Sequence, residues 1–130
     1  MIILVGRGDI AMKGTHSVAE RIKGLLEKIP GIQCAFIYGS YPRNLKHPEG
    51  DVEIMVVGTP DLVELDESIL SVEKDLGMPI DVTSYTVREL QERINVRDPL
   101  VSRALKGPRI TLIGEDPLAN RSSIHYNSRG

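Results

Sequence analysis

The sequence predicts an α/β domain in which strands and helices alternate along the chain. Short apolar runs of strand length recur, and stretches with apolar residues at helical spacing separate them. Apolar residues make up 41% of the 130 residues and charged residues 26%, as in ordinary soluble globular proteins. A chain of this length fits one compact unit, so we expect residues 1–130 to form a single domain.

The predicted elements follow one another in a regular order. An apolar run at 1–5 is a candidate strand, and the pattern Ser17-x-x-Glu20 predicts the capped start of a helix that Pro30-Gly31 ends. Residues 39–50 form a loop with room for one helical turn, and the polar stretch 115–130 is expected to be a loose tail. The other strands are expected at 32–38, 51–57, 79–85 and 109–113, and the other helices at 62–76, 87–94 and 99–105.

Charge and cysteine content exclude several classes of protein. The net charge of -2 argues against an extended nucleic-acid surface, which needs clustered positive charge. The single Cys34 excludes an internal disulfide and a cysteine-based zinc site, and it fits a reducing interior. No apolar run approaches the ~20 residues of a membrane span, and the first run is too short for a signal peptide. We therefore expect a cytoplasmic protein with no membrane partner.

Two acidic residues stand out in the strand predicted at 51–57. Asp51 and Glu53 are two residues apart and would point to the same face of a strand that is otherwise Val, Ile and Met. Adjacent buried carboxylates are costly unless a cation compensates their charge, and Mg²⁺ takes oxygen ligands. The pair predicts a divalent metal site. The alternative is an edge strand whose charges face water.

Further residues could complete such a site. Asp81 lies among apolar neighbours in the next predicted strand and would approach the same metal if the two strands pair. Gly39 and Ser40 directly follow a strand; glycine permits close backbone approach, and a hydroxyl with neighbouring N–H groups suits a phosphate. Arg43 on the same loop could neutralise phosphate charge.

Segments 36–43 and 50–57 resemble the nucleotidyltransferases of the DNA-polymerase-beta-like superfamily. That pattern is a Gly-Ser after a strand, followed about a dozen residues later by a strand that carries Asp-x-Asp or Asp-x-Glu. The minimal nucleotidyltransferases of archaea and bacteria, some of which pair with a HEPN-type toxin, are the most similar in pattern. The resemblance extends over the core 29–114, through 77–82 and 98–114. It departs at Asn44, where a second Gly is usual, and at Gly50, where Ser is common.

The resemblance implies a nucleotidyltransferase fold, with a mixed β-sheet flanked by helices. It implies two Mg²⁺ ions, with Mn²⁺ as the alternative, held by Asp51, Glu53 and Asp81. It also implies a triphosphate held at Gly39, Ser40 and Arg43. The expected reaction moves a nucleoside monophosphate, with ATP as the expected donor, to an acceptor hydroxyl on a protein or small molecule and releases pyrophosphate.

Other functions stay open at this point. The chain could be an antitoxin or regulatory nucleotide-binding module with weak or no catalysis and a HEPN-type partner protein, or a catalytically silent nucleotide sensor. A homo-oligomer is compatible with either. The Gly-x-Gly-x-x-Ala pattern at 6–11 would suit a dinucleotide fold, but no helix opens directly after it and the next strand ends in Gly-Ser instead of an acid.

Overall fold

The computed structural model describes residues 15–43 and 51–115. The candidate strand at 1–5, the glycine pattern at 6–11 and the predicted tail beyond residue 115 lie outside the described residues. Within the described part, a four-stranded sheet has the order β4-β3-β2-β5. Its strands are β2 (Ile32–Tyr38), β3 (Val52–Gly58), β4 (Ile80–Tyr85) and β5 (Ile110–Ile113).

The sheet is mixed, as the resemblance to the nucleotidyltransferases implied. Strand β2 pairs antiparallel with β3 and with β5, while β3 pairs parallel with β4. A dinucleotide fold would need a mostly parallel sheet, so this pairing disagrees with that alternative. The parallel pair is joined by a helical crossover, as parallel strands require.

Five helices occur in the described residues: α2 (Thr15–Leu26), α3 (Ser40–Arg43), α4 (Leu62–Leu76), α5 (Val87–Asn95) and α6 (Pro99–Lys106). The helical turn expected in the loop after residue 39 is therefore present as α3. One predicted boundary is wrong: α2 already begins at Thr15, so Ser17 lies inside the helix and does not cap it. The capping-box pattern misled because residues three apart also share one side of an uninterrupted helix.

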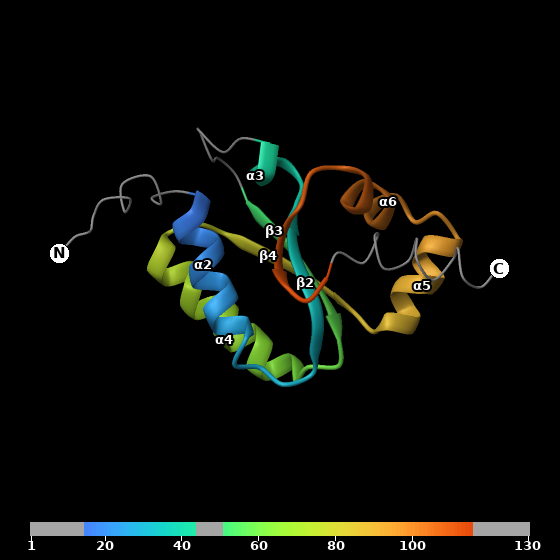
Figure 1. The fold of residues 1–130 in the computed structure, drawn as a ribbon. Helices are drawn as coiled ribbons and strands as arrows, with labels where there is room; N and C mark the ends of the chain where they lie inside the picture. Colours follow the sequence, from blue (N-terminus) through green and yellow to red (C-terminus); the bar gives the residue numbers. More distant parts are fainter. Residues whose placement is uncertain (1–14, 44–50, 116–130) are drawn as a thin grey trace.

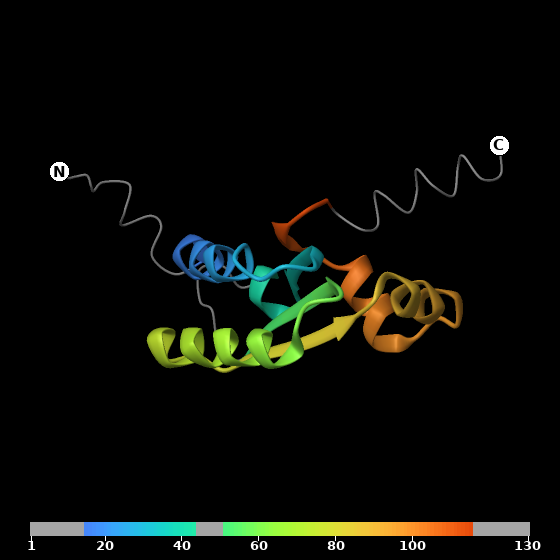
Figure 2. The same cartoon turned by 90° about the horizontal axis from the view of Figure 1, so that it is seen from below.

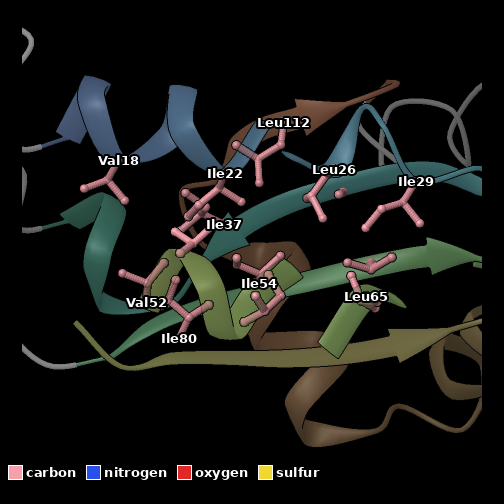
Figure 3. Packing of buried hydrophobic residues seen from close by; sticks show 14 of the residues in the cluster. Val18, Ile22, Leu26, Ile29, Ile37, Val52, Ile54, Leu65, Ile80 and Leu112 are labelled. Atoms are coloured by element: carbon pink, nitrogen blue, oxygen red, sulfur yellow. The ribbon is translucent and has the colours of Figure 1, made fainter. Parts of the chain in front are cut away.

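Helices cover both faces of the sheet (Figure 1). Helices α2 and α4 lie side by side on one face, whereas α5 and α6 lie towards the other, as the view from below also shows (Figure 2). The core beneath α2 and α4 brings together aliphatic side chains from helices and strands, among them Ile22, Ile54 and Leu65 (Figure 3). The core beneath α5 and α6 includes Phe36 and Met55.

Strand β3 is apolar on both faces. Val52, Ile54 and Val56 face the first core, and Met55 and Val57 face the second. The strand lies between β4 and β2, so the alternative of an exposed edge strand at 51–57 is wrong. Glu53 is therefore an acidic residue in an inner strand, and its charge needs a partner nearby.

Side-chain caps fix the starts of three helices, α4 on the first face and α5 and α6 on the second. Asp61 accepts hydrogen bonds from the N–H groups of Val63 and Glu64 at the start of α4. Thr86 and Glu89 form the predicted capping box of α5, and Asp98 accepts from the N–H of Val101 to start α6. None of the helices in the described segments has both the length and the apolar character that crossing a membrane demands.

Leu65 and Leu62 test this packing on one helix. Leu65 is 1% exposed and Leu62 58% exposed, so Leu65→Ala should lower the free energy of unfolding by about 2–5 kcal/mol. Leu62→Ala should change it by no more than about 0.5 kcal/mol. Urea denaturation followed by circular dichroism measures both. Equal losses would contradict the described placement of α4.

Candidate active site

Tyr38, Glu53 and Asp81 form a row across one end of the sheet. Tyr38 on β2 is in register with Glu53 on β3, and Glu53 is in register with Asp81 on β4. Residues in register on neighbouring strands point to the same face, so the row lies on the face that carries the second core. The pairing of the Glu53 and Asp81 strands, on which the predicted site depends, is confirmed.

Gly39 lies directly against Glu53. Its backbone has a φ of 83°, in the left-handed region where glycine is favoured. A Cβ atom at this position would collide with the Glu53 carboxylate. With a side chain at this position, the carboxylate end of the flexible Glu53 side chain would have to shift away from the backbone. The turn predicted to hold phosphate thus touches one of the predicted metal ligands.

Arg103 supplies the positive charge next to Glu53. Its Nη2 atom lies 3.5 Å from Oε1 of Glu53, and the Glu53 side chain is 20% exposed against 55% for Arg103. The guanidinium carbon lies 5.9 Å from the centre of the Tyr38 ring. Sequence reasoning missed Arg103 and Tyr38. The amphipathic pattern of 99–105 predicts a helix, but it does not say which strand end its cations reach.

Tyr38 is buried among these groups, and its side chain makes a hydrogen bond with that of Thr83 on β4. Burial raises the pKa of the Tyr38 hydroxyl above its ordinary value near 10.0, and the negative charges of Glu53 and Asp81 add to this. The bond with Thr83 and the charge of Arg103 lower the pKa by less. The hydroxyl is therefore protonated at neutral pH.

The other predicted residues have exposed side chains or lie at the ends of elements. Asp51 directly precedes β3, Asp81 lies on the edge strand β4, and Ser40 opens α3; all three are exposed. Arg43 is the last residue of α3, and its side chain lies outside the description. The structure thus brings Gly39, Glu53 and Asp81 together at one end of the sheet.

The carboxylates match the ligand chemistry of a hard divalent cation without forming a closed cage. Across residues 15–43 and 51–115, no group of three or more His, Cys, Asp or Glu side chains is gathered closely enough to hold a metal ion. Neighbouring carboxylates repel one another when no cation lies between them, which favours spread side chains. Oxygen donors from Asp51, Glu53 and Asp81 are the ligands that Mg²⁺ prefers. The three-acid metal site stays a prediction.

Comparison with known proteins places this arrangement in a known fold. No family model and no curated protein matches the sequence. Among solved structures, a chain of a toxin–antitoxin complex with AMP-PNP has 22% identity and a TM-score of 0.57, covering 85% of this chain and 87% of that one. A chain of the MntA–HepT toxin–antitoxin complex has 19% identity and a TM-score of 0.55, with 88% of each chain covered.

A third similar structure is a complex of a tri-AMPylated Shewanella oneidensis HEPN toxin with an MNT antitoxin. It has 18% identity and a TM-score of 0.53, covering 87% of this chain and 83% of that chain. The chain has the nucleotidyltransferase fold. The predicted fold class is thereby confirmed. In this chain, the row formed by Tyr38, Glu53 and Asp81 lies at the end of the sheet where β2 ends and β3 begins.

Gly39 can be tested against a second left-handed glycine. Gly77 has a φ of 67°, and a Cβ there would meet nothing within 4 Å. Gly77→Ala should therefore lose only the backbone term of about 1 kcal/mol. Gly39→Ala should lose about 0.5–1.5 kcal/mol more than Gly77→Ala, because the carboxylate end of the Glu53 side chain must also shift. Chemical denaturation measures both. In a Glu53→Ala background the loss at Gly39 should fall to that at Gly77; an unchanged loss would contradict the described contact.

Tyr38→Phe should show a stability effect that depends on pH. Near neutral pH the variant should lose about 1 kcal/mol, because the bond with Thr83 is gone. Since the fold raises the pKa of Tyr38, the unfolded chain loses its proton first as pH rises past about 10, and wild-type stability falls. The difference between wild type and variant should therefore stay constant up to about pH 9 and shrink as the pH rises through about 10 and above. Urea titrations at several pH values measure it; a difference that grows with pH would oppose this account.

Proposed function

We propose that this chain catalyses metal-dependent nucleotidyl transfer. It takes a nucleoside monophosphate from a triphosphate, with ATP as the donor, places it on an acceptor hydroxyl and releases pyrophosphate. The contact between Gly39 and the Glu53 carboxylate is the observation that supports this best. A turn suited to phosphate and an acid suited to a metal meet there, with Asp81 in register beside them.

Each residue of the site has a role in this proposal. Asp51, Glu53 and Asp81 hold Mg²⁺, which when bound neutralises developing charge and makes the attacking hydroxyl more acidic. Gly39 and Ser40 contact phosphate oxygens through backbone N–H groups and a hydroxyl, and Arg43 adds positive charge. As the alternative to holding metal, Asp81, which is exposed on an edge strand, is suited to accept the proton of the acceptor hydroxyl.

The acceptor in this proposal is a hydroxyl of a HEPN-type partner protein. Of the similar structures, one contains AMP-PNP and one contains a tri-AMPylated HEPN toxin with its antitoxin. The acceptor oxygen bonds to the α-phosphorus, the bond from that phosphorus to the α,β-bridging oxygen breaks, and pyrophosphate leaves. The hydroxyl proton passes to the carboxylate base.

A second candidate is an antitoxin or regulatory module that binds the nucleotide and its partner without transfer. The toxin–antitoxin complexes of the same fold favour a protein partner in either case. The two candidates differ in one outcome: whether the α-phosphate becomes covalently attached to the partner.

Binding of ATP with Mg²⁺ tests the site itself. Asp51→Asn should weaken binding by roughly tenfold or more, because a ligand carboxylate is lost. Asp66→Asn, a matched change at an exposed position of α4, should leave binding unchanged. Isothermal titration calorimetry measures all three proteins. Equal affinity in wild type and Asp51→Asn would count against a metal–nucleotide site at this end of the sheet.

Label transfer tests the reaction. Incubation of the protein with a purified HEPN-type protein, Mg²⁺ and ATP labelled at the α-phosphate should yield labelled partner. ATP labelled at the γ-phosphate should yield none, because that phosphate leaves in pyrophosphate. Binding without α-label transfer would favour the second candidate, and transfer of the γ-label would rule out nucleotidyl transfer.

A further inference from the structure

Two arginines of the second face have nearly the same surroundings. The guanidinium carbon of Arg103 lies 5.9 Å from the centre of the Tyr38 ring, and its Nη2 atom lies 3.5 Å from Oε1 of Glu53. The guanidinium carbon of Arg93 lies 5.8 Å from the centre of the Tyr85 ring, and its Nη1 atom lies 3.2 Å from Oδ2 of Asp98. Their side chains are 55% and 52% exposed. The main difference between the two arginines is their position, since of the two only Arg103 contacts a predicted metal ligand.

The distance between the two clusters follows from the strand register. Tyr85 is in register with Val57, four residues along β3 from the position where Asp81 is in register with Glu53. At about 3.3 Å per residue this is about 13 Å along the strand. The Arg93 cluster is therefore a control that the chain itself supplies.

The negative charge of the half-buried Glu53 carboxylate favours a cation beside it, whether that cation is Arg103 or a metal ion. Glu53 is half-buried, and the carboxylates of Glu53 and Asp81 both act on the buried Tyr38 hydroxyl, as does Arg103. Among the residues that the structure describes, the guanidinium of Arg103 is the positive charge that lies beside Glu53. A divalent ion bound to the same carboxylate would take over that neutralisation and release the guanidinium.

We propose that Arg103 is a nucleotide-binding residue that changes its anionic partner when the metal and the nucleotide bind. It neutralises Glu53 when the metal is absent, and it binds a phosphate oxygen of the triphosphate when the metal occupies that carboxylate. The planar guanidinium fits both carboxylate and phosphate, and the Tyr38 ring holds it over the site in either state. This inference rests on the proposed function.

Competition for Glu53 gives the proposal a distinctive signature. Removing the Arg103 charge relieves competition with the metal, so binding of the metal alone becomes tighter. The same change removes a phosphate contact, so binding of the metal–nucleotide complex becomes weaker. An ion pair that merely anchors α6 to the sheet would not move the two affinities in opposite directions.

The test uses Arg103→Gln, Arg103→Lys and the matched control Arg93→Gln. Mn²⁺ alone, followed by the electron paramagnetic resonance signal of the free ion, should bind Arg103→Gln about two- to fivefold more tightly than wild type. ATP with Mg²⁺, followed by calorimetry, should bind it about five- to tenfold more weakly. Arg103→Lys keeps the positive charge, so its affinities for Mn²⁺ and for ATP with Mg²⁺ should both lie between those of wild type and Arg103→Gln. Arg93→Gln should match wild type in both measurements.

The outcomes separate this inference from the proposed function. If wild type itself fails to bind ATP with Mg²⁺, the proposed function falls and the inference falls with it. If wild type binds but both affinities of Arg103→Gln move in the same direction, or neither moves, only the inference is overturned. If Arg103→Gln fails to fold, the same comparison is made with Arg103→Lys: affinities for Mn²⁺ and for ATP with Mg²⁺ that do not move in opposite directions would overturn the inference. An equal response of Arg93→Gln would also overturn it, because the effect would then not belong to the site.

Discussion

Glu53 sets the main constraint on this structure, because it places a carboxylate in an inner strand that is otherwise apolar. Half-buried charge is unfavourable unless neighbouring groups compensate it. Here the carboxylate lies against the backbone of Gly39 and faces the guanidinium of Arg103. A left-handed glycine after β2 and a cation on α6 thus both lie against one acidic side chain.

The topology makes this compensation possible. Antiparallel pairing of β2 with β3 brings the end of one strand beside the start of the other, so Tyr38 and Glu53 share one end of the sheet. Parallel pairing of β3 with β4 adds Asp81 at the same level. The capped helices α5 and α6 then return to the face that carries this row. Residues far apart in sequence meet because this end of the sheet carries the end of β2 beside the starts of β3 and β4.

Much of the fold could be predicted from the sequence because its local signals agree with the tertiary structure. The bounds of β2 and α4 match the prediction, since a glycine or proline punctuates each end and the apolar periodicity between them is clear. The start of α2 was wrong because a capping pattern at Ser17 is equally compatible with a helix interior.

The candidate site was predictable only in part. Gly39, Glu53 and Asp81 follow from strand patterns, since alternation fixes the face and a turn residue marks the strand end. Arg103 and Tyr38 could not be found in this way: the contact depends on how α6 docks, and Tyr38 reads as an ordinary apolar strand residue. Local sequence also does not determine whether Asp51, Glu53 and Asp81 converge on one ion, because their side-chain positions depend on the charge of the ion itself.

The similar structures share this fold at low identity, so the chemistry has to be established on the chain itself. Crystals grown with Mn²⁺ and a non-hydrolysable ATP analogue give the most direct measurement, because anomalous scattering locates the ion independently of any assumed ligand. The account predicts manganese bound to oxygens of Asp51, Glu53 and Asp81, with the analogue's phosphates at Gly39 and Ser40. Manganese and nucleotide bound elsewhere, or a nucleotide bound with none of these acids in contact with the ion, would contradict it.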